Sequence, residues 1–226
     1  MAGYFQAERW RVKLRSREEE RTVMTAAAVK SSTNRSRSRS VAYVALSVAL
    51  MAVGAWVTVP FGPVPFTLQT FAVMFALFAL APSEALAAIA CYLVLGAVGL
   101  PVFSGFKGGI ASLLGPTGGF IVGFLVAAAI ALGVAYLLRK LPFFSATESK
   151  SFLGAKIQAG ELARNILMGI VFLAVLYVFG WAWLSISAGM SIEAAFVAAV
   201  APFVPIDACK MVLAVLVAQA VRVAIR

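Results

Sequence analysis

Long apolar runs separated by short polar or irregular stretches set the pattern of this chain. A helix needs about 20 residues to cross the hydrocarbon core of a bilayer. Six runs reach or approach this length, at residues 41–59, 67–81, 84–99, 118–138, 161–184 and 205–223. Before the last run, a further short helix is predicted at 192–200. The pattern therefore predicts an all-α membrane protein with six transmembrane helices.

The connection between the third and fourth runs, residues 96–123, is dense in glycine. It holds nine of the chain's 18 glycines, two prolines and one charge, Lys107. Irregular backbone cannot face lipid, where unpaired N–H and C=O groups find no water. Gly105 and Gly108 flank the lysine and allow the backbone to approach a small molecule closely. We expect a loop folded over a binding pocket, with Lys107 as a fixed positive charge near the ligand.

The composition, 62% hydrophobic and 12% charged, is far more apolar than that of a soluble domain. The net charge of +10 does not indicate nucleic-acid binding, because ten of the nineteen basic residues precede residue 41. Most others lie between or after the apolar runs, where they set the orientation in the membrane. This rule places residues 1–40, 139–160 and 222–226, and hence both termini, in the cytoplasm. The expected location is the inner (cytoplasmic) membrane, crossed several times and surrounded by lipid.

The same orientation places three separated stretches on the outer side of the membrane. They are the proline-rich loop 60–66, the glycine-rich connection and the start of the last helix, PIDACK. We therefore expect these stretches to converge at one mouth.

Two regions are predicted along the chain. Residues 1–40 combine ten Lys or Arg with four Glu and a Ser/Arg-rich end, which is typical of a disordered tail. No apolar signal-peptide core precedes residue 41, so the tail is expected to stay in the cytosol. Met24 is a second candidate start, which would leave residues 1–23 outside the protein. Residues 41–226 form the predicted substrate-binding membrane domain.

Charged side chains at the predicted mouth are the first candidates for ligand binding. Asp207 and Lys210 stand three apart, so on a helix they lie on one face. Intramembrane ionisable groups are costly and are functional candidates by default. Lys107 with Lys210 could bind a carboxylate, while Asp207 could accept hydrogen bonds from N–H groups. The alternative is an Asp207–Lys210 pair that neutralises itself and supports the fold.

Less polar residues complete the predicted pocket. Gln69, at the start of the second run, either contacts the ligand or makes a helix–helix hydrogen bond. Apolar walls are expected from Phe103, Phe106, Phe61 and Phe66. The predicted ligand is a small, mostly apolar molecule with an acid group.

Small residues recur every three or four positions along the first run. Ala42, Ala45, Ala49 and Ala52 form one smooth face, which lets another helix approach closely in lipid. This face either packs inside the protein or docks a separate subunit.

Several chemistries have no support in the sequence. The chain has no histidine, and Cys91 and Cys209 lie in apolar surroundings where we expect them to be buried. No metal site, cofactor site or thiol–histidine pair is therefore expected. No G-x-x-x-x-G-K-[ST] loop is present to bind ATP.

Four motifs occur in order, namely VPFTLQTF, GLPVFSGFKGG, GPTGGF and a proline-x-Asp-x-x-Lys helix start. Through them residues 41–223 resemble the BioY family, the biotin-binding S components of energy-coupling-factor (ECF) vitamin transporters. The resemblance implies a six-helix membrane protein that binds biotin at its outer side. It also implies a transmembrane coupling (T) subunit and two cytosolic ATPase subunits as partners, docked through small residues of the first helix.

Carried over residue by residue, the resemblance implies Asp207, Lys210 and Lys107 as biotin contacts. Family members often have glycine where this chain has Ile206 and arginine where it has Lys107. Lysine keeps the charge but lacks the bidentate fork of arginine. Two alternatives stay open, a stand-alone biotin carrier without ATPase partners and a membrane-embedded enzyme with Asp207 as general base. The sequence shows no second catalytic carboxylate near Asp207, which counts against the enzyme.

Overall fold

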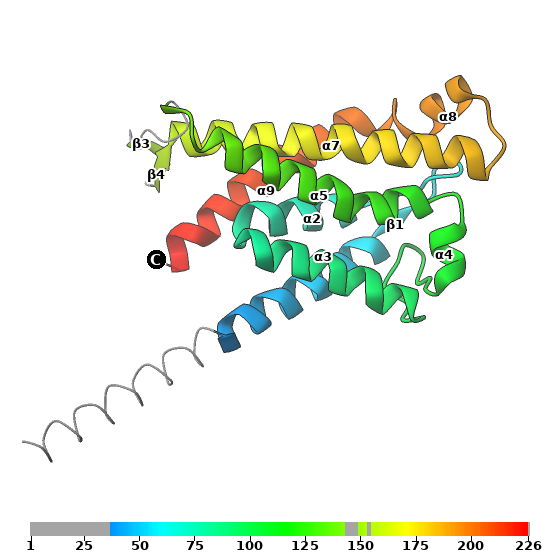
Figure 1. The fold of residues 1–226 in the computed structure, drawn as a ribbon, viewed down its shortest axis with the longest axis horizontal. Helices are drawn as coiled ribbons and strands as arrows, with labels where there is room; N and C mark the ends of the chain where they lie inside the picture. Colours follow the sequence, from blue (N-terminus) through cyan, green and yellow to red (C-terminus); the bar gives the residue numbers. More distant parts are fainter. Residues whose placement is uncertain (1–36, 143–148, 153–154, 226) are drawn as a thin grey trace, which may run out of the picture. The chain divides into compact units, whose positions relative to one another are not determined.

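The computed structural model describes residues 37–142, 149–152 and 155–225 (Figure 1). Most of the predicted basic tail, residues 1–36, lies outside the described residues. Tertiary contacts divide the chain into residues 1–42 and residues 43–226, and all contacts described below lie within the second unit.

The described residues are mostly helical, and each of the six predicted runs contains a helix. The first helix spans Arg37–Trp56. The others are α2 (Gln69–Ala79), α3 (Pro82–Ala97), α4 (Ile110–Leu114), α5 (Gly118–Leu138), α7 (Ala159–Ser187), α8 (Ile192–Ala199) and α9 (Phe203–Ile225). Two short antiparallel hairpins join them, β1 (Thr58–Val59) with β2 (Phe66–Thr67) and β3 (Ser149–Phe152) with β4 (Ala155–Gln158).

Four of the described helices are long and apolar enough to cross a membrane. These are the first helix, α5, α7 and α9. α2 and α3 have 11 and 16 residues, which at 1.5 Å per residue is roughly 16 and 24 Å. α2 begins two residues after the start of the predicted run at residue 67, because Phe66 and Thr67 pair with Val59 and Thr58 in the β1–β2 hairpin.

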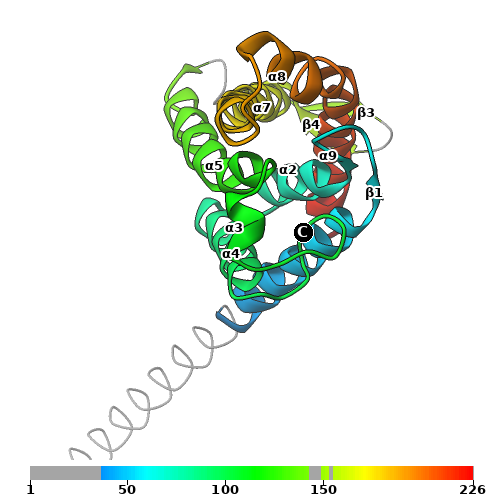
Figure 2. The same ribbon diagram turned by 90° about the vertical axis from the view of Figure 1, so that its right-hand side faces the viewer.

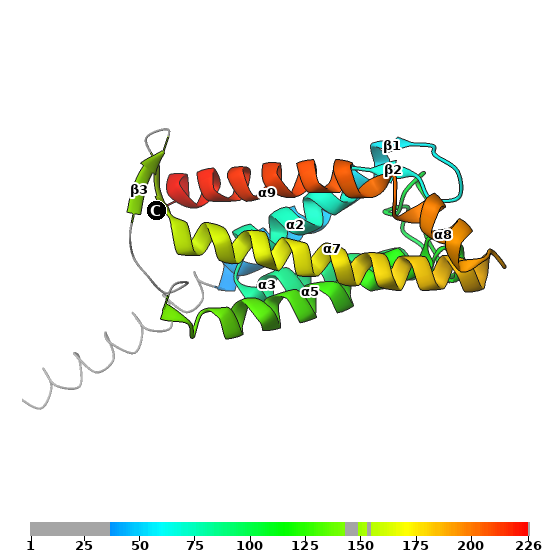
Figure 3. The same ribbon diagram turned by 90° about the horizontal axis from the view of Figure 1, so that it is seen from above.

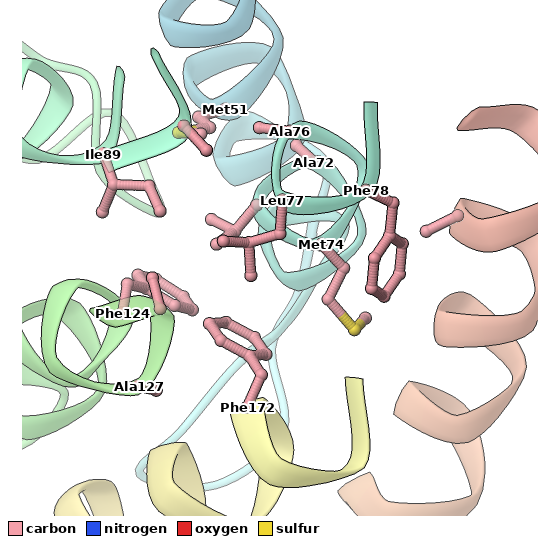
Figure 4. Packing of buried hydrophobic residues seen from close by; sticks show 14 of the residues in the cluster. Met51, Ala72, Met74, Ala76, Leu77, Phe78, Ile89, Phe124, Ala127 and Phe172 are labelled. Carbon is pink, nitrogen blue, oxygen red and sulfur yellow. The ribbon is translucent and has the colours of Figure 1, made fainter. Parts of the chain in front are cut away.

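α2 is the central helix of the second unit. Seen along the helices, it lies between the first helix, α3, α5 and α9 (Figure 2). Eight of its eleven residues are buried, as expected of a helix that is apolar on all sides. Figure 4 shows Leu77 and Met74 of α2 pointing toward Phe124 of α5 and Phe172 of α7. Those two phenyl rings are nearly parallel, with centroids 6.3 Å apart.

α5 and α7 pack along most of their length (Figures 1 and 3). Glycines make the close approach possible. A Cβ atom on Gly119 would lie 2.2 Å from Cβ of Trp183, and one on Gly180 would lie 2.1 Å from the Phe120 ring. Trp183 also donates a hydrogen bond from Nε1 to the carbonyl of Gly115, at 2.9 Å. The contact fixes the start of α5, which carries part of the cavity wall.

Both cysteines are exposed, so the prediction that they are buried is wrong. Cys91 lies in α3 and Cys209 in α9, each on a face turned away from the core. In a membrane protein the outward face is also apolar, so apolar neighbours in the sequence do not predict burial inside the protein.

Candidate ligand-binding site

A cavity of about 360 Å³ lies at the end of the bundle where α2, α5 and α9 begin. Its walls come from the β2–α2 segment, the loop 103–107, the α4–α5 segment, α7 and the first turns of α9. The hairpin β1–β2 and helix α8 lie at this same end (Figure 3). The volume is within the range of small-molecule sites, roughly 300–1,000 Å³. Four stretches far apart in the sequence, within 64–70, 103–124, 176–177 and 203–210, therefore build one pocket.

An ion pair with its hydrogen-bond partners forms the polar wall of the cavity. Lys210 Nζ lies 2.8 Å from Asp207 Oδ1, and both residues are buried, at 8% and 3% exposure. Thr70 donates to Asp207 Oδ1 at 3.1 Å, and the Tyr177 hydroxyl donates to Oδ2 at 2.8 Å. The lysine also donates to the carbonyl of Thr67 at 2.7 Å and to Thr70 Oγ1 at 3.3 Å. The predicted i, i+3 pair is thus present and held from three elements.

The number of hydrogen bonds that each group makes distinguishes Lys210 from Asp207. An ammonium has three donors, and those of Lys210 are directed at Thr67, Thr70 and Asp207. A carboxylate accepts about four hydrogen bonds, and Asp207 accepts three, two on Oδ1 and one on Oδ2. In this arrangement Asp207 Oδ2 can accept a further N–H, whereas Lys210 has no donor left for a ligand.

Lys107 is a positive charge of a different kind. It lies on the glycine-rich loop, lines the cavity, and is exposed. Among the described residues it has no ion pair. The loop is shaped by left-handed backbone at Gly105 (φ 70°) and Phe106 (φ 57°), and closed by a hydrogen bond from Phe103 N to Lys107 O at 2.9 Å. The loop thereby presents an uncompensated cation to the cavity.

Gly105 and Gly108 shape this loop but do not line the cavity themselves. Gly108 is packed so tightly that a Cβ atom there would lie 2.2 Å from the carbonyl oxygen of Leu100. Both glycines lie in the loop that carries Lys107.

Phe103 forms an apolar wall, as predicted for it, and is only 1% exposed. Its ring packs directly on Gly96 of α3, where a Cβ atom would lie 2.0 Å from Cζ. Gln69 also lines the cavity. Its amide donates to the Tyr92 hydroxyl at 2.8 Å, and Tyr92 donates to the carbonyl of Val102 at 2.8 Å. Gln69 thus makes a helix–helix hydrogen bond and still faces the cavity.

The other predicted aromatic walls are wrong, because Phe61, Phe66 and Phe106 do not line the cavity. Phe66 packs between Phe61 and Phe203, with ring centroids 4.8 and 4.3 Å away. The aromatic lining comes instead from residues that the sequence did not single out, Phe120, Phe124, Tyr177 and Phe203. A tyrosine inside an apolar run, such as Tyr177, was the one available signal.

Side-chain contacts join the glycine-rich loop to residues 56 and 58, at the end of the first helix and in β1. The Trp56 indole stacks on the Phe106 ring at a centroid distance of 5.1 Å and donates to the carbonyl of Pro101 at 2.8 Å. The hydroxyls of Thr58 and Ser104 lie 3.1 Å apart. The end of the first helix, the hairpin and the glycine-rich loop are thus joined by side chains.

The predicted docking face lies on the first helix. Ala45 and Ala49 are exposed, whereas Ala52, next on the same face, is buried. Ala42 ends the separate N-terminal unit.

The cavity offers binding rather than bond-breaking chemistry. Its two charged groups that can still bind a ligand are the buried Asp207 carboxylate, with one free acceptor site, and the exposed Lys107 ammonium. Uncharged polar side chains, such as Gln69 and Ser104, also line the mostly apolar walls. Within the described residues, no group of three His, Cys, Asp or Glu side chains could hold a metal ion. A ligand that fits has an N–H donor at one end, an apolar body and an anionic group.

Comparisons with known proteins identify the family of the chain. The family model of the BioY family matches residues 24–226. A probable biotin transporter BioY from Pyrococcus horikoshii is 38% identical over 183 residues, or 81% of this chain and 96% of that protein. The biotin transporter BioY of Thermotoga maritima is 38% identical over 171 residues, or 75% of this chain and 88% of that protein.

A solved structure is similar as well. The crystal structure of the S-component for biotin from an ECF-type ABC transporter matches with a TM-score of 0.68 and 27% identity, over 84% of this chain and 93% of that chain. The family model covers well over half of the sequence, and the relatives are matched over most of their length. The chain therefore belongs to the BioY family.

Proposed function

We propose that this protein captures biotin in the cavity and is the substrate-binding subunit of an ATP-driven ECF-type transporter. The observation that carries the proposal is the cavity itself, which places a carboxylate acceptor and an unpaired ammonium in mostly apolar walls. The relatives named as biotin transporters and the similar biotin S-component support the choice of ligand.

Biotin has the chemistry that the cavity calls for. Its ureido ring carries N–H donors for Asp207, its sulfur-containing ring and aliphatic chain suit the apolar walls, and its carboxylate suits Lys107. Lys210 then acts by holding the Asp207 carboxylate in place rather than by contacting the ligand. Gln69 and Phe103 complete the proposed site, and Gly105 and Gly108 position its loop.

The proposed topology is that of a multi-pass protein of the inner membrane. All six helices that match the apolar runs lie across the membrane, including the short α2 and α3, with both termini in the cytoplasm. The short helices are compatible with this arrangement because α2 is enclosed by other helices rather than by lipid. The glycine-rich loop and the cavity then open to the outside. Residues 1–40 form a cytosolic tail, and residues 41–226 form the membrane domain.

The proposed partners are a T subunit and two cytosolic ATPase subunits, which supply the energy. The exposed Ala45 and Ala49, with Ala42, are the proposed docking face on the first helix. No ATP-binding loop of the G-x-x-x-x-G-K-[ST] type is present in the chain, so hydrolysis is assigned to the partners. The enzyme alternative is set aside, because the relatives are named as transporters.

The test is equilibrium binding of radiolabelled biotin to the detergent-purified full chain, with biotin methyl ester as competitor. Removing a hydrogen bond to a charged group costs about 1.5–3 kcal/mol. We therefore expect Lys107→Ala to weaken biotin binding at least tenfold but to leave the affinity for the ester unchanged. Lys140→Ala, an exposed lysine outside the cavity, is the matched control.

Absence of biotin binding by the folded wild-type protein would overturn the proposal. Equal losses for biotin and its ester in Lys107→Ala would overturn the assignment of the carboxylate to Lys107. Biotin uptake into liposomes by the chain alone would identify a stand-alone carrier instead of a subunit.

A further inference from the structure

A second cluster of charges lies at the end of the bundle opposite the cavity. Arg139 caps the C-terminus of α5, and Arg222 lies in the last turn of α9. Glu161 and Arg164 lie near the start of α7. Arg222 donates to the Glu161 carboxylate in an ion pair whose side chains are 30% and 23% exposed. The ends of α5, α7 and α9 thus place Arg139 and Arg222 near Arg164, with one carboxylate, Glu161, in the cluster.

Positive charge exceeds negative charge around Arg164. The charges of Arg139, Glu161 and Arg222 all act on its guanidinium, which is partly buried. Among the described side chains Arg164 has no ion pair, and the nearby Glu161 is paired with Arg222. A guanidinium held near two others and partly removed from water is stabilised by an anion. Its planar fork fits the oxygens of a phosphate.

Apolar surface lies beside the cluster. Tyr136 and Leu137, in the last turn of α5 next to Arg139, are 62% and 60% exposed. A free phosphate ion would leave these side chains uncovered. A phosphate that carries acyl chains would pair with the arginines and cover the apolar surface together.

We propose that Arg164, with Arg139 and Arg222, forms a binding site for the phosphate headgroup of an anionic phospholipid. The site is independent of biotin and uses no residue of the cavity. The lipid phosphate lies at the helix ends, and its acyl chains run along the outer face of α5.

The test measures phospholipid bound to the detergent-purified full chain, by native mass spectrometry with phosphatidylglycerol or phosphatidylcholine. An arginine near an anionic headgroup contributes about a fivefold change in affinity. We expect Arg164→Gln to weaken phosphatidylglycerol binding about fivefold and to leave phosphatidylcholine binding unchanged. Lys140→Gln is the matched control, because it removes an exposed charge next to Arg139 that lies over the Tyr136 ring. We expect it to change binding less than twofold.

A variant that is expected to bind more tightly is also tested, because misfolding can weaken binding but does not strengthen it. Glu161→Gln removes the competing carboxylate, so we expect it to tighten phosphatidylglycerol binding. Unchanged binding in both Arg164→Gln and Glu161→Gln would overturn the proposal. Equal losses in Arg164→Gln and Lys140→Gln would also overturn it, because they would indicate diffuse attraction rather than a site. Displacement of the lipid by millimolar inorganic phosphate would show that the site takes a free anion instead.

Discussion

The Asp207–Lys210 pair makes a prediction that separates its structural role from its role in binding. Three proteins are compared with the wild type: Asp207→Asn, Lys210→Met and the double variant. Both residues are almost fully buried, and each interacts with residues of other elements. Each single variant therefore leaves one charge in the interior without its counter-charge.

The magnitudes follow from the burial and the partners. Removing one member of a buried ion pair costs about 3–5 kcal/mol. The double variant removes both charges and leaves chiefly the Thr67 carbonyl without its donor, a loss of about 1–3 kcal/mol. The double variant is therefore expected to be more stable than either single variant. All three are expected to lose biotin binding. Asp207→Asn and the double variant remove the carboxylate that accepts from the ligand, and Lys210→Met removes the contact that holds this carboxylate in place.

Two measurements on the same purified samples test this reasoning. Unfolding in mixed micelles of increasing denaturing detergent gives the order of stability, and equilibrium dialysis with labelled biotin gives the affinity. A double variant less stable than both single variants would refute the electrostatic account. A folded double variant that binds biotin like the wild type would show that the pair supports only the fold.

Two further variants test the walls of the cavity. Gly96→Ala places a methyl group inside the Phe103 ring, so we expect a loss of about 1–3 kcal/mol in stability and weaker biotin binding. Gly133→Ala in α5 is the control, because the added methyl group meets no atom within 4 Å. Equal stability and equal biotin affinity of the two variants, in unfolding and binding assays, would contradict the packing argument. Tyr177→Phe removes the donor to Asp207 Oδ2, so we expect roughly tenfold weaker biotin binding, measured against Tyr136→Phe, an exposed tyrosine outside the cavity. Unchanged affinity in Tyr177→Phe would show that this hydroxyl does not orient the carboxylate.

The helices could be predicted from the sequence because apolar runs, prolines and charges mark them locally. The fourth run, 118–138, coincides with α5, and the last run differs from α9 by two residues at each end. The β1–β2 hairpin was missed because the prolines between residues 60 and 65 exclude a helix without indicating what replaces it. The lengths of α2 and α3 depend on their neighbours, which no local pattern encodes.

The cavity residues that could be predicted are those whose charge is unusual in an apolar part of the sequence. Asp207, Lys210 and Lys107 are charges in or beside apolar runs, and the structure brings all three to one cavity. Thr70 carries no such signal, and Tyr177 stands out only as a tyrosine inside an apolar run. They join Asp207 across 137 and 30 residues of sequence. The prediction that Phe61, Phe66 and Phe106 line the cavity failed for a related reason. An aromatic ring in a loop packs against whichever neighbour the fold provides, and the local sequence does not encode that neighbour.

The hydrogen bonds that join α2 to α9 also have a consequence for biosynthesis. α2 is translated long before α9, so Thr70 lacks its partners while most of the chain is made. α9 then delivers Asp207 and Lys210 already paired one helical turn apart, which lowers the cost of carrying two charges into the bilayer. The cavity is therefore completed only when α9 has been made, and a ribosome stalled before residue 207 leaves a chain without the Asp207 carboxylate.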